Sequence, residues 1–196
     1  MSTSRRAAEK PDYHHGDLRR ALLDAATKIV ARDGAPAVTL REVARLAGVS
    51  HNAPYRHFDS LAALLAAVAA EGFETFGAQL TKAAAAEGDA KRRATAIGRA
   101  YLRFALDNPK LYLLMFGGEL DKGQHPALRA AADKSFSVLT ATLSKAGRAG
   151  HVAAIGAWAF VHGLAHLVLD KQIKPNDPAI VDLLGAPAAR PRQDHR

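Results

Sequence analysis

The stretch TLREVARLAGVSHNAPYRHF, residues 39–58, carries two short helix signatures on either side of a glycine turn. Thr39 and Glu42 have the spacing of a capping box, which predicts a helix that begins immediately after the threonine. Apolar residues then recur at helical spacing and give that helix one inner face. Gly48 favours the left-handed conformation that ends a helix, and Ser50 is a preferred N-cap for a second one. This spacing predicts a helix-turn-helix unit.

The second of these predicted helices has an apolar side and a polar side. Pro54 and Phe58 lie four residues apart and face inward, which leaves four polar groups on the open side: His51, Asn52, Tyr55 and Arg56. Asparagine bonds adenine in the major groove, the methyl of Ala53 can contact thymine, and histidine, tyrosine and arginine donate to phosphates. A hairpin that only packs against its own chain would more often expose Glu, Lys and Gln. The exposed side chains therefore favour a DNA-reading surface.

Three motifs stand out in the first third of the chain: YHHGDLRRALLDAA at residues 13–26, AGVS at residues 47–50 and YRHF at residues 55–58. Together with the capped helix they resemble the N-terminal domain of the TetR/AcrR family of bacterial transcription regulators. The resemblance implies that a long fourth helix joins a DNA-binding head to a ligand-binding body. It also implies DNA contacts from the supporting helix and from the recognition segment, at Thr39, Arg41, Ser50, His51, Asn52, Ala53, Tyr55, Arg56 and His57.

Two further features of the head bear on its affinity for DNA. Where the family usually has a lysine at the start of the fourth helix, this chain has Leu61, so one expected phosphate contact is missing. Residues 1–11 form a polar arm that contains Arg5, Arg6 and Lys10, and we predict that this arm is disordered in the free protein. Such an arm either orders against DNA or stays a solvated tail.

The composition is that of a globular protein with a basic surplus. Of the 196 residues, 48% are hydrophobic, and 27 Lys and Arg against 19 Asp and Glu give a net charge of +8 and a pI near 10. The surplus is spread along the chain, so charge alone supports an anionic partner only weakly. The chain has no cysteine, which excludes disulfides, thiol redox sensing and thiolate metal sites and fits a cytoplasmic protein.

Helical periodicity continues to the end of the body with few strand signals, so we predict an all-α chain. We expect a first helix capped by Asp17 that ends at Asp33, and a long helix capped by Ser60. Further helices are expected at residues 91–106, 109–116, 127–148, 151–170 and 178–184, with a loop at 117–126. The predicted organisation is a disordered basic arm (1–11), a three-helix helix-turn-helix DNA-binding domain (12–60), a helical ligand-binding and dimerisation domain (61–186) and a disordered tail (187–196).

The body carries two motifs of its own. WAFVHGLA at residues 158–165 resembles the pattern for which the WHG class of TetR C-terminal domains is named, and YLRFALDNPKLYLLMF at residues 101–116 is similar to that class. Gly156, Ala159 and Gly163 form a stripe of small residues that allows close helix approach. In the family the last two large helices make a two-fold four-helix interface. The resemblance therefore implies a homodimer that reads a palindromic operator.

Residues 152–169 are almost entirely apolar and about as long as a thin transmembrane span. They are rich in Ala and Gly rather than Leu and Ile and contain two histidines, so a buried helix of a bundle explains them better. His162, His166 and Asp170 have the spacing of three ligands on one helix face, which leaves a helical metal-binding protein or enzyme as an alternative. The chain has no phosphate loop, nucleophile elbow or HExxH motif, so we expect no catalytic residue, cofactor or metal.

An effector pocket is expected among aromatic and methionine side chains of the body: Phe104, Tyr112, Met115, Phe116, Trp158 and His162. The alternative is that these residues are plain core. If they line a cavity, its ligand is a mainly apolar small molecule with one polar group, held near Trp158. The sequence thus predicts a ligand-responsive, sequence-specific DNA-binding transcription regulator, a repressor released from its operator by that ligand. A non-specific nucleoid-type DNA binder is the other alternative.

Overall fold

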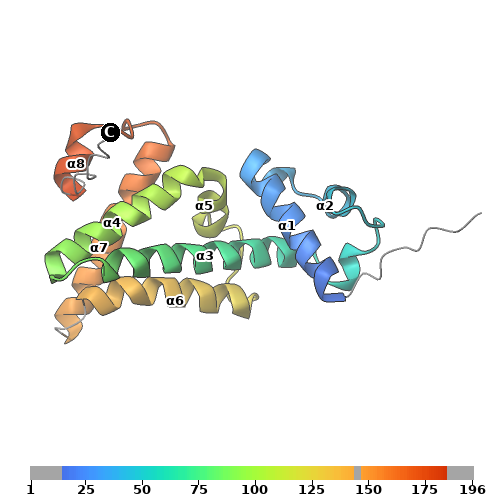
Figure 1. Ribbon diagram of the computed structural model, residues 1–196, viewed down its shortest axis with the longest axis horizontal. Coiled ribbons are helices and arrows are strands. Elements are labelled where there is room, and N and C mark those ends of the chain that lie inside the picture. Colours follow the sequence, from blue (N-terminus) through green and yellow to red (C-terminus); the bar gives the residue numbers. More distant parts are fainter. Residues whose placement is uncertain (1–14, 144–146, 185–196) are drawn as a thin grey trace, which may run out of the picture.

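The structure is a computed structural model that describes residues 15–143 and 147–184, and within these ranges every regular element is a helix (Figure 1). This confirms the all-α prediction. The predicted arm at 1–11 and tail at 187–196 lie outside the described residues. The elements are α1 (His15–Asp33), η1 (Ala35–Ala37), α2 (Leu40–Leu46), η2 (Pro54–Arg56), α3 (Leu61–Ala85), α4 (Ala90–Asp107), α5 (Pro109–Phe116), α6 (Pro126–Leu143), α7 (Gly147–Leu169) and α8 (Pro178–Leu184).

Helices α1 and α2 and the short helix η2 form a small head at one end of the molecule, on the right in Figure 1. The Thr39 hydroxyl oxygen accepts a 3.1 Å hydrogen bond from the backbone N–H of Glu42, so α2 begins where the sequence predicts. The predicted capping box is only half formed. The Glu42 carboxylate accepts hydrogen bonds of 2.8 and 2.6 Å from the Arg45 guanidinium, whereas in a capping box it would accept one from the backbone N–H of Thr39. Gly48, at φ 71°, follows the end of α2 as expected.

Two of the predicted helix starts are wrong. Helix α1 already includes His15, the first residue that the structure describes, so Asp17 lies inside the helix and is not its N-cap. The segment after Ser50 is a turn followed by the 3-10 helix η2, where an α-helix was predicted. Proline lacks the N–H that an α-helix would donate at position 54, and the backbone N–H of Ala53 instead donates to the Ser50 carbonyl three residues earlier. The third helix of the head is therefore one short turn.

The predicted break between the two longest C-terminal helices is also displaced. Helix α6 ends at Leu143, and α7 begins at Gly147 with φ 59°, a conformation that favours glycine. Gly150, where the sequence suggested the break, is buried inside α7. The boundaries predicted for α5 and α8 agree with the structure, because proline opens both helices.

Helix α3 is the longest element and runs from the head through the body, with α6 beside it below and α4 and α5 above it in Figure 1. The Ser60 hydroxyl oxygen accepts a 3.0 Å hydrogen bond from the backbone N–H of Ala63, which confirms the predicted cap. Farther along, Phe73 and Phe76 are each only 2% exposed and lie in the core of the body. The same rigid helix thus belongs to both the head and the body.

Helix α5 forms a second connection between the two parts. It packs against α1 and η1 in the head and against α3 and α4 in the body. Gly72 on α3 permits this close approach, because a Cβ at that position would lie 2.7 Å from the Met115 sulfur on α5. On the other side, the Lys110 ammonium donates to the carbonyl oxygen of Arg32 in the last turn of α1. Helix α5 is therefore in direct contact with α1, so a displacement of α5 would change its contacts with the head.

Candidate functional site

The start of α2 and the residues 50–57, which we call the recognition segment, form one exposed face of the head. A concavity on this face is lined by five of the predicted DNA contacts: Thr39, Arg41, His51, Asn52 and Tyr55. All five side chains are exposed, and Tyr55 is 61% exposed, an unusual placement for a large aromatic ring. Ser50 and Arg56 are exposed outside the concavity, and His57 is half-buried.

The charges on this face are suited to an anionic partner. Arg41 and Arg56 take part in none of the ion pairs formed by the described residues. Arg45, by contrast, is held by Glu42 at 2.6 Å. An exposed guanidinium without a carboxylate partner can bind phosphate oxygens, and the amide of Asn52 can read a base edge in the same groove. The face therefore carries groups that can bind a DNA backbone beside a group that can distinguish bases.

Two positions of the head differ from the sequence-based expectation. Ala53 is only 9% exposed because its backbone is helical at the start of η2 and its methyl group points into the head. The predicted contact of this methyl with thymine is therefore absent from the exposed surface. Leu61, where the family usually has a lysine, is half-buried and packs against the core. This position contributes to packing at the start of α3.

In the body, aromatic rings from α3, α4 and α5 meet in one cluster. The ring of Phe76 lies 4.9 Å from that of Tyr101 and 5.0 Å from that of Phe104, distances typical of favourable edge and tilted contacts. Three predicted pocket residues, Phe104, Tyr112 and Met115, are 2% exposed or less. The structure places these three in the core, as the alternative interpretation expected.

A cavity of about 240 Å³ opens beside this cluster, between α3, α6, α7 and the loop after α5. We call it the aromatic cavity, because five aromatic side chains and one lysine line it: Phe73, Phe76, Phe116, Phe136, Trp158 and Lys122. Two of the predicted pocket residues, Phe116 and Trp158, are among them. Lys122 is an additional residue of the site: it lies in a glycine-rich loop, which has no periodicity from which to predict it.

Four polar groups next to this cavity form a hydrogen-bonded cluster in the interior. Nδ1 of His162 lies 2.7 Å from the Tyr112 hydroxyl and 2.8 Å from the Tyr101 hydroxyl, and the two hydroxyls are 3.2 Å apart. The indole N–H of Trp158 donates to the Tyr101 oxygen at 3.4 Å. Burial raises the pKa of Tyr101 to about 12 and also raises the pKa of Tyr112, so both phenols stay protonated. The buried polar atoms of these four side chains are thus hydrogen-bonded to one another.

His162 is expected to make the stability of the protein depend on pH. Burial lowers the pKa of its imidazole, and the charges of His166 and Lys122 lower it further. The unfolded chain then binds a proton more readily than the folded one, so stability is complete above about pH 6.5 and falls as the pH drops below it. Urea unfolding midpoints at pH 7.5 and 5.5 should show this loss, and His162→Gln should reduce it. The exposed His151→Gln serves as control; an equal reduction in both variants would contradict the assignment.

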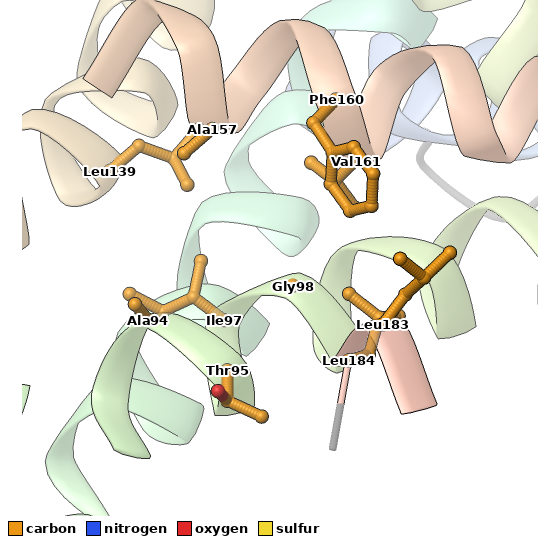
Figure 2. Close-up of a pocket in the computed structure, with 10 residues that line it drawn as sticks. All are labelled: Ala94, Thr95, Ile97, Gly98, Leu139, Ala157, Phe160, Val161, Leu183 and Leu184. Atoms are coloured by element: carbon orange, nitrogen blue, oxygen red, sulfur yellow. The ribbon is translucent and has the colours of Figure 1, made fainter. Parts of the chain in front are cut away.

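A second cavity, of about 190 Å³, lies between α4, α6, α7 and α8 (Figure 2). Figure 2 shows Ile97 and Gly98 on one side, Phe160 and Val161 on the other, and Leu184 closing one end. Its lining contains no charged side chain, and the Thr95 hydroxyl is its one polar side-chain group. The predicted ligand has a polar group, and the aromatic cavity suits such a ligand better.

The alternative metal site is incomplete in the described structure: the rings of His162 and His166 lie 4.7 Å apart, but Asp170 does not join them. Nδ1 of His162 is engaged by the tyrosine hydroxyls, and Asp170 is exposed just beyond the end of α7. Across the described ranges, no three His, Cys, Asp or Glu side chains are grouped as ligands of one ion. The structure therefore gives no support to the metal-binding alternative.

Helix α7 presents an apolar face with no partner in the described chain. Val152, Ile155 and Leu167 are between 44% and 62% exposed and lie on one side of the helix. Phe160 is 47% exposed at the edge of this side, where it also lines the second cavity. A Cβ added at Gly156 or Gly163, on the same side, would meet no atom within 4 Å. By length and composition alone, α3 and α7 could each cross a membrane. Only 28% of the most apolar part of α7 is buried, so the helix is less buried within one copy of the chain than the sequence predicts. We name the exposed apolar side of α7 the α7 face.

Two family models match the sequence over the parts just described. Residues 22–68 match the model for bacterial regulatory proteins of the tetR family, and residues 94–184 match that for the tetracyclin repressor-like C-terminal domain. The first match contains the recognition segment. The second contains both body motifs, the hydrogen-bonded cluster and the α7 face. No curated protein matches the chain.

Solved structures share this fold along nearly the whole chain. A protein of unknown function from Rhodococcus sp. RHA1 is 33% identical over 89% of this chain and 97% of its own, with a TM-score of 0.76. The transcriptional regulator FadR from Bacillus subtilis, in complex with stearoyl-CoA, is 15% identical over 84% and 94%, with a TM-score of 0.66. The multidrug binding protein EbrR, complexed with imidazole, is 21% identical over 95% and 99%, also at 0.66. The last two likenesses show the fold alone.

Proposed function

Since this chain belongs to the TetR family of bacterial regulatory proteins and is a ligand-responsive DNA-binding regulator, we propose that it is a cytoplasmic homodimeric repressor. It binds a palindromic operator and leaves it when a small effector enters the body. The observation that carries the proposal is the exposed concave face of the head, where Arg41, Asn52 and Tyr55 lie together within the matched region. The proposal includes no catalytic step.

Dimerisation through the α7 face supplies the symmetry that a palindromic operator requires. In a two-fold dimer the same apolar surface of each copy covers the other, and Gly156 and Gly163 let the two backbones approach closely. Burial of exposed side chains such as Val152 and Ile155 provides the driving force. The two heads then reach half-sites about one DNA turn apart, each through its own recognition segment.

An effector in the aromatic cavity can act on the head through two helices. Phe73 and Phe76 line the cavity from α3, which begins in the head, and Phe116 lines it from the end of α5, which packs on α1. An effector that fits one position of these helices better than another changes the separation of the two heads. A differential affinity of about 1–3 kcal/mol, or roughly 5- to 150-fold, is the usual size of such coupling. Neighbours of this fold carry ligands too, stearoyl-CoA in FadR and imidazole in EbrR.

Base reading by Asn52 gives the first test of the proposal. We expect Asn52→Ala to weaken binding to the operator by about 1–3 kcal/mol, or roughly 5- to 150-fold, with little effect on scrambled DNA. Tyr55→Phe should weaken binding to both DNA molecules more evenly, because a hydroxyl directed at phosphate carries no sequence information. Fluorescence anisotropy with both DNA molecules measures these affinities.

The matched control is Gln79→Ala, which removes an exposed amide from α3 in the body. It should leave both affinities unchanged. If Asn52→Ala weakened operator and scrambled DNA by the same factor, Asn52 would not be reading a base, and a non-specific DNA binder would become the better description.

A further inference from the structure

The aromatic cavity holds one positive charge next to its aromatic walls. The Lys122 ammonium nitrogen lies 5.1 Å from the centroid of the Phe73 ring and 5.9 Å from that of Phe116. Both rings line the cavity, and the lysine lines it with them. Ring faces attract a cation, so this geometry keeps the ammonium group at the cavity instead of extended into water.

This charge is incompletely compensated within the described part of the chain. Lys122 takes part in none of the ion pairs found there. Asp133 also lines the cavity, but its side chain is 75% exposed and its carboxylate lies 3.8 Å from the Arg129 guanidinium. Burial lowers the pKa of Lys122, and only the charge of Asp133 opposes this shift. An anionic group inside the cavity would offset the desolvation of the ammonium group.

The remaining walls define the rest of the ligand. Phe76, Phe136 and Trp158 offer flat apolar surface, and the Ser135 hydroxyl is occupied, because it donates to the Ala132 carbonyl oxygen. The volume of about 240 Å³ is below the range of about 300–1,000 Å³ usual for drug-sized ligands. The ligand is therefore small, has a single polar end, and carries its apolar part against the rings.

We propose that the aromatic cavity binds a small aryl or short-chain alkyl carboxylate, whose anionic group pairs with Lys122 and whose apolar part lies against Phe136 and Trp158. The inference rests on the proposed function, in which the body holds an effector. It specifies that this effector is anionic and that Lys122 selects it. The loop that carries Lys122 follows Phe116 at the end of α5, so ion pairing occurs next to the helix that contacts the head.

The test compares 4-phenylbutanoate with its neutral amide, 4-phenylbutanamide, by isothermal titration calorimetry on the full chain. We expect the acid to bind about tenfold tighter, because a hydrogen bond to a charged partner typically exceeds a neutral one by roughly that factor. Lys122→Met should abolish this preference, and Lys122→Arg should keep it. The single tryptophan, Trp158, reports whether the ligand occupies the cavity, since its emission should change in parallel.

The control variant is Lys134→Met, which removes an exposed lysine from the same region of the surface and should keep the preference for the acid. Thermal unfolding of each variant verifies that it is folded; Lys122→Met should not be less stable, because it removes a desolvated charge and leaves an apolar chain on the rings. Equal affinities for acid and amide, a preference that survives in Lys122→Met, or no binding of either compound at millimolar concentration would overturn the inference.

The outcome for the cavity can be separated from the outcome for the proposed function. If the acid binds with a preference that depends on Lys122 but leaves operator affinity unchanged, the cavity assignment holds and release by this ligand is wrong. If the protein shows no sequence preference in the absence of ligand, the regulator proposal fails, and the comparison of acid with amide still decides the role of Lys122.

Discussion

Ile155→Glu on the α7 face is expected to convert the protein into monomers and to weaken operator binding by about 10²- to 10⁴-fold. The reason is that two linked heads bind a palindrome with an avidity that neither head has alone. Ile155 is 45% exposed, and a buried, unpaired carboxylate on the α7 face would oppose association. Analytical ultracentrifugation gives the mass of the particle, and a titration with operator DNA gives the loss of affinity.

Leu113→Glu is the matched control for this substitution. Leu113 lies on α5 and is 44% exposed, so the variant places the same charge on an equally exposed apolar position away from α7. It should remain dimeric and keep its operator affinity. If Ile155→Glu also remained a dimer, the interface would have to lie on another surface.

Phe76→Ala is expected to lower the free energy of unfolding by about 3–5 kcal/mol. The ring is 2% exposed and contacts Tyr101, Phe104 and Phe116, with centroids 4.9 to 6.0 Å apart, so its removal leaves a void between α3, α4 and α5. For a domain of this size the loss lowers the melting temperature by roughly 6 to 20 °C. Denaturant unfolding monitored by circular dichroism measures it.

The neighbouring Thr75→Ala is the control, because Thr75 is exposed on the same turn of α3. Its effect should be within about 0.5 kcal/mol. A loss below about 1 kcal/mol for Phe76→Ala would mean that the body repacks easily, and the cavity beside Phe76 would then have no fixed shape.

Local signals in the sequence predicted much of the fold because they act through neighbouring backbone groups. The caps at Thr39 and Ser60 and the proline starts of α5 and α8 depend only on residues within one turn, and all are present in the structure. Where two local signals competed, the prediction was wrong. Ser50 favours a helix start, but Pro54 lacks the donor that the first turn needs, and the segment became a 3-10 helix.

The glycines between α6 and α7 show a second limit. Gly147 and Gly150 can each end a helix, and the sequence does not say which one does. In the structure α7 begins at Gly147, and Gly150 is buried inside it, where it makes tertiary contacts. Local propensity carries no information about such contacts.

The candidate site in the body depended even more on tertiary contacts. Aromatic residues at helical spacing indicated a cluster around Trp158 and Phe116, and both line the cavity. Helical spacing alone does not show which of these residues line the cavity and which lie in the core, and Met115 lies in the core. The Lys122 ammonium group lies over the rings of Phe73 and Phe116 through a tertiary contact, and a loop has no periodicity from which to predict that contact.

Selection from random DNA decides whether this protein reads a DNA sequence. The protein would be allowed to enrich its preferred site from a pool of random DNA, and its affinity for that site and for a scrambled version would be compared at two salt concentrations. We predict a palindrome with half-sites about one turn apart and a preference above roughly a thousandfold. Enrichment of no sequence, with equal affinities that differ only through the salt dependence of phosphate contacts, would contradict sequence-specific reading of DNA.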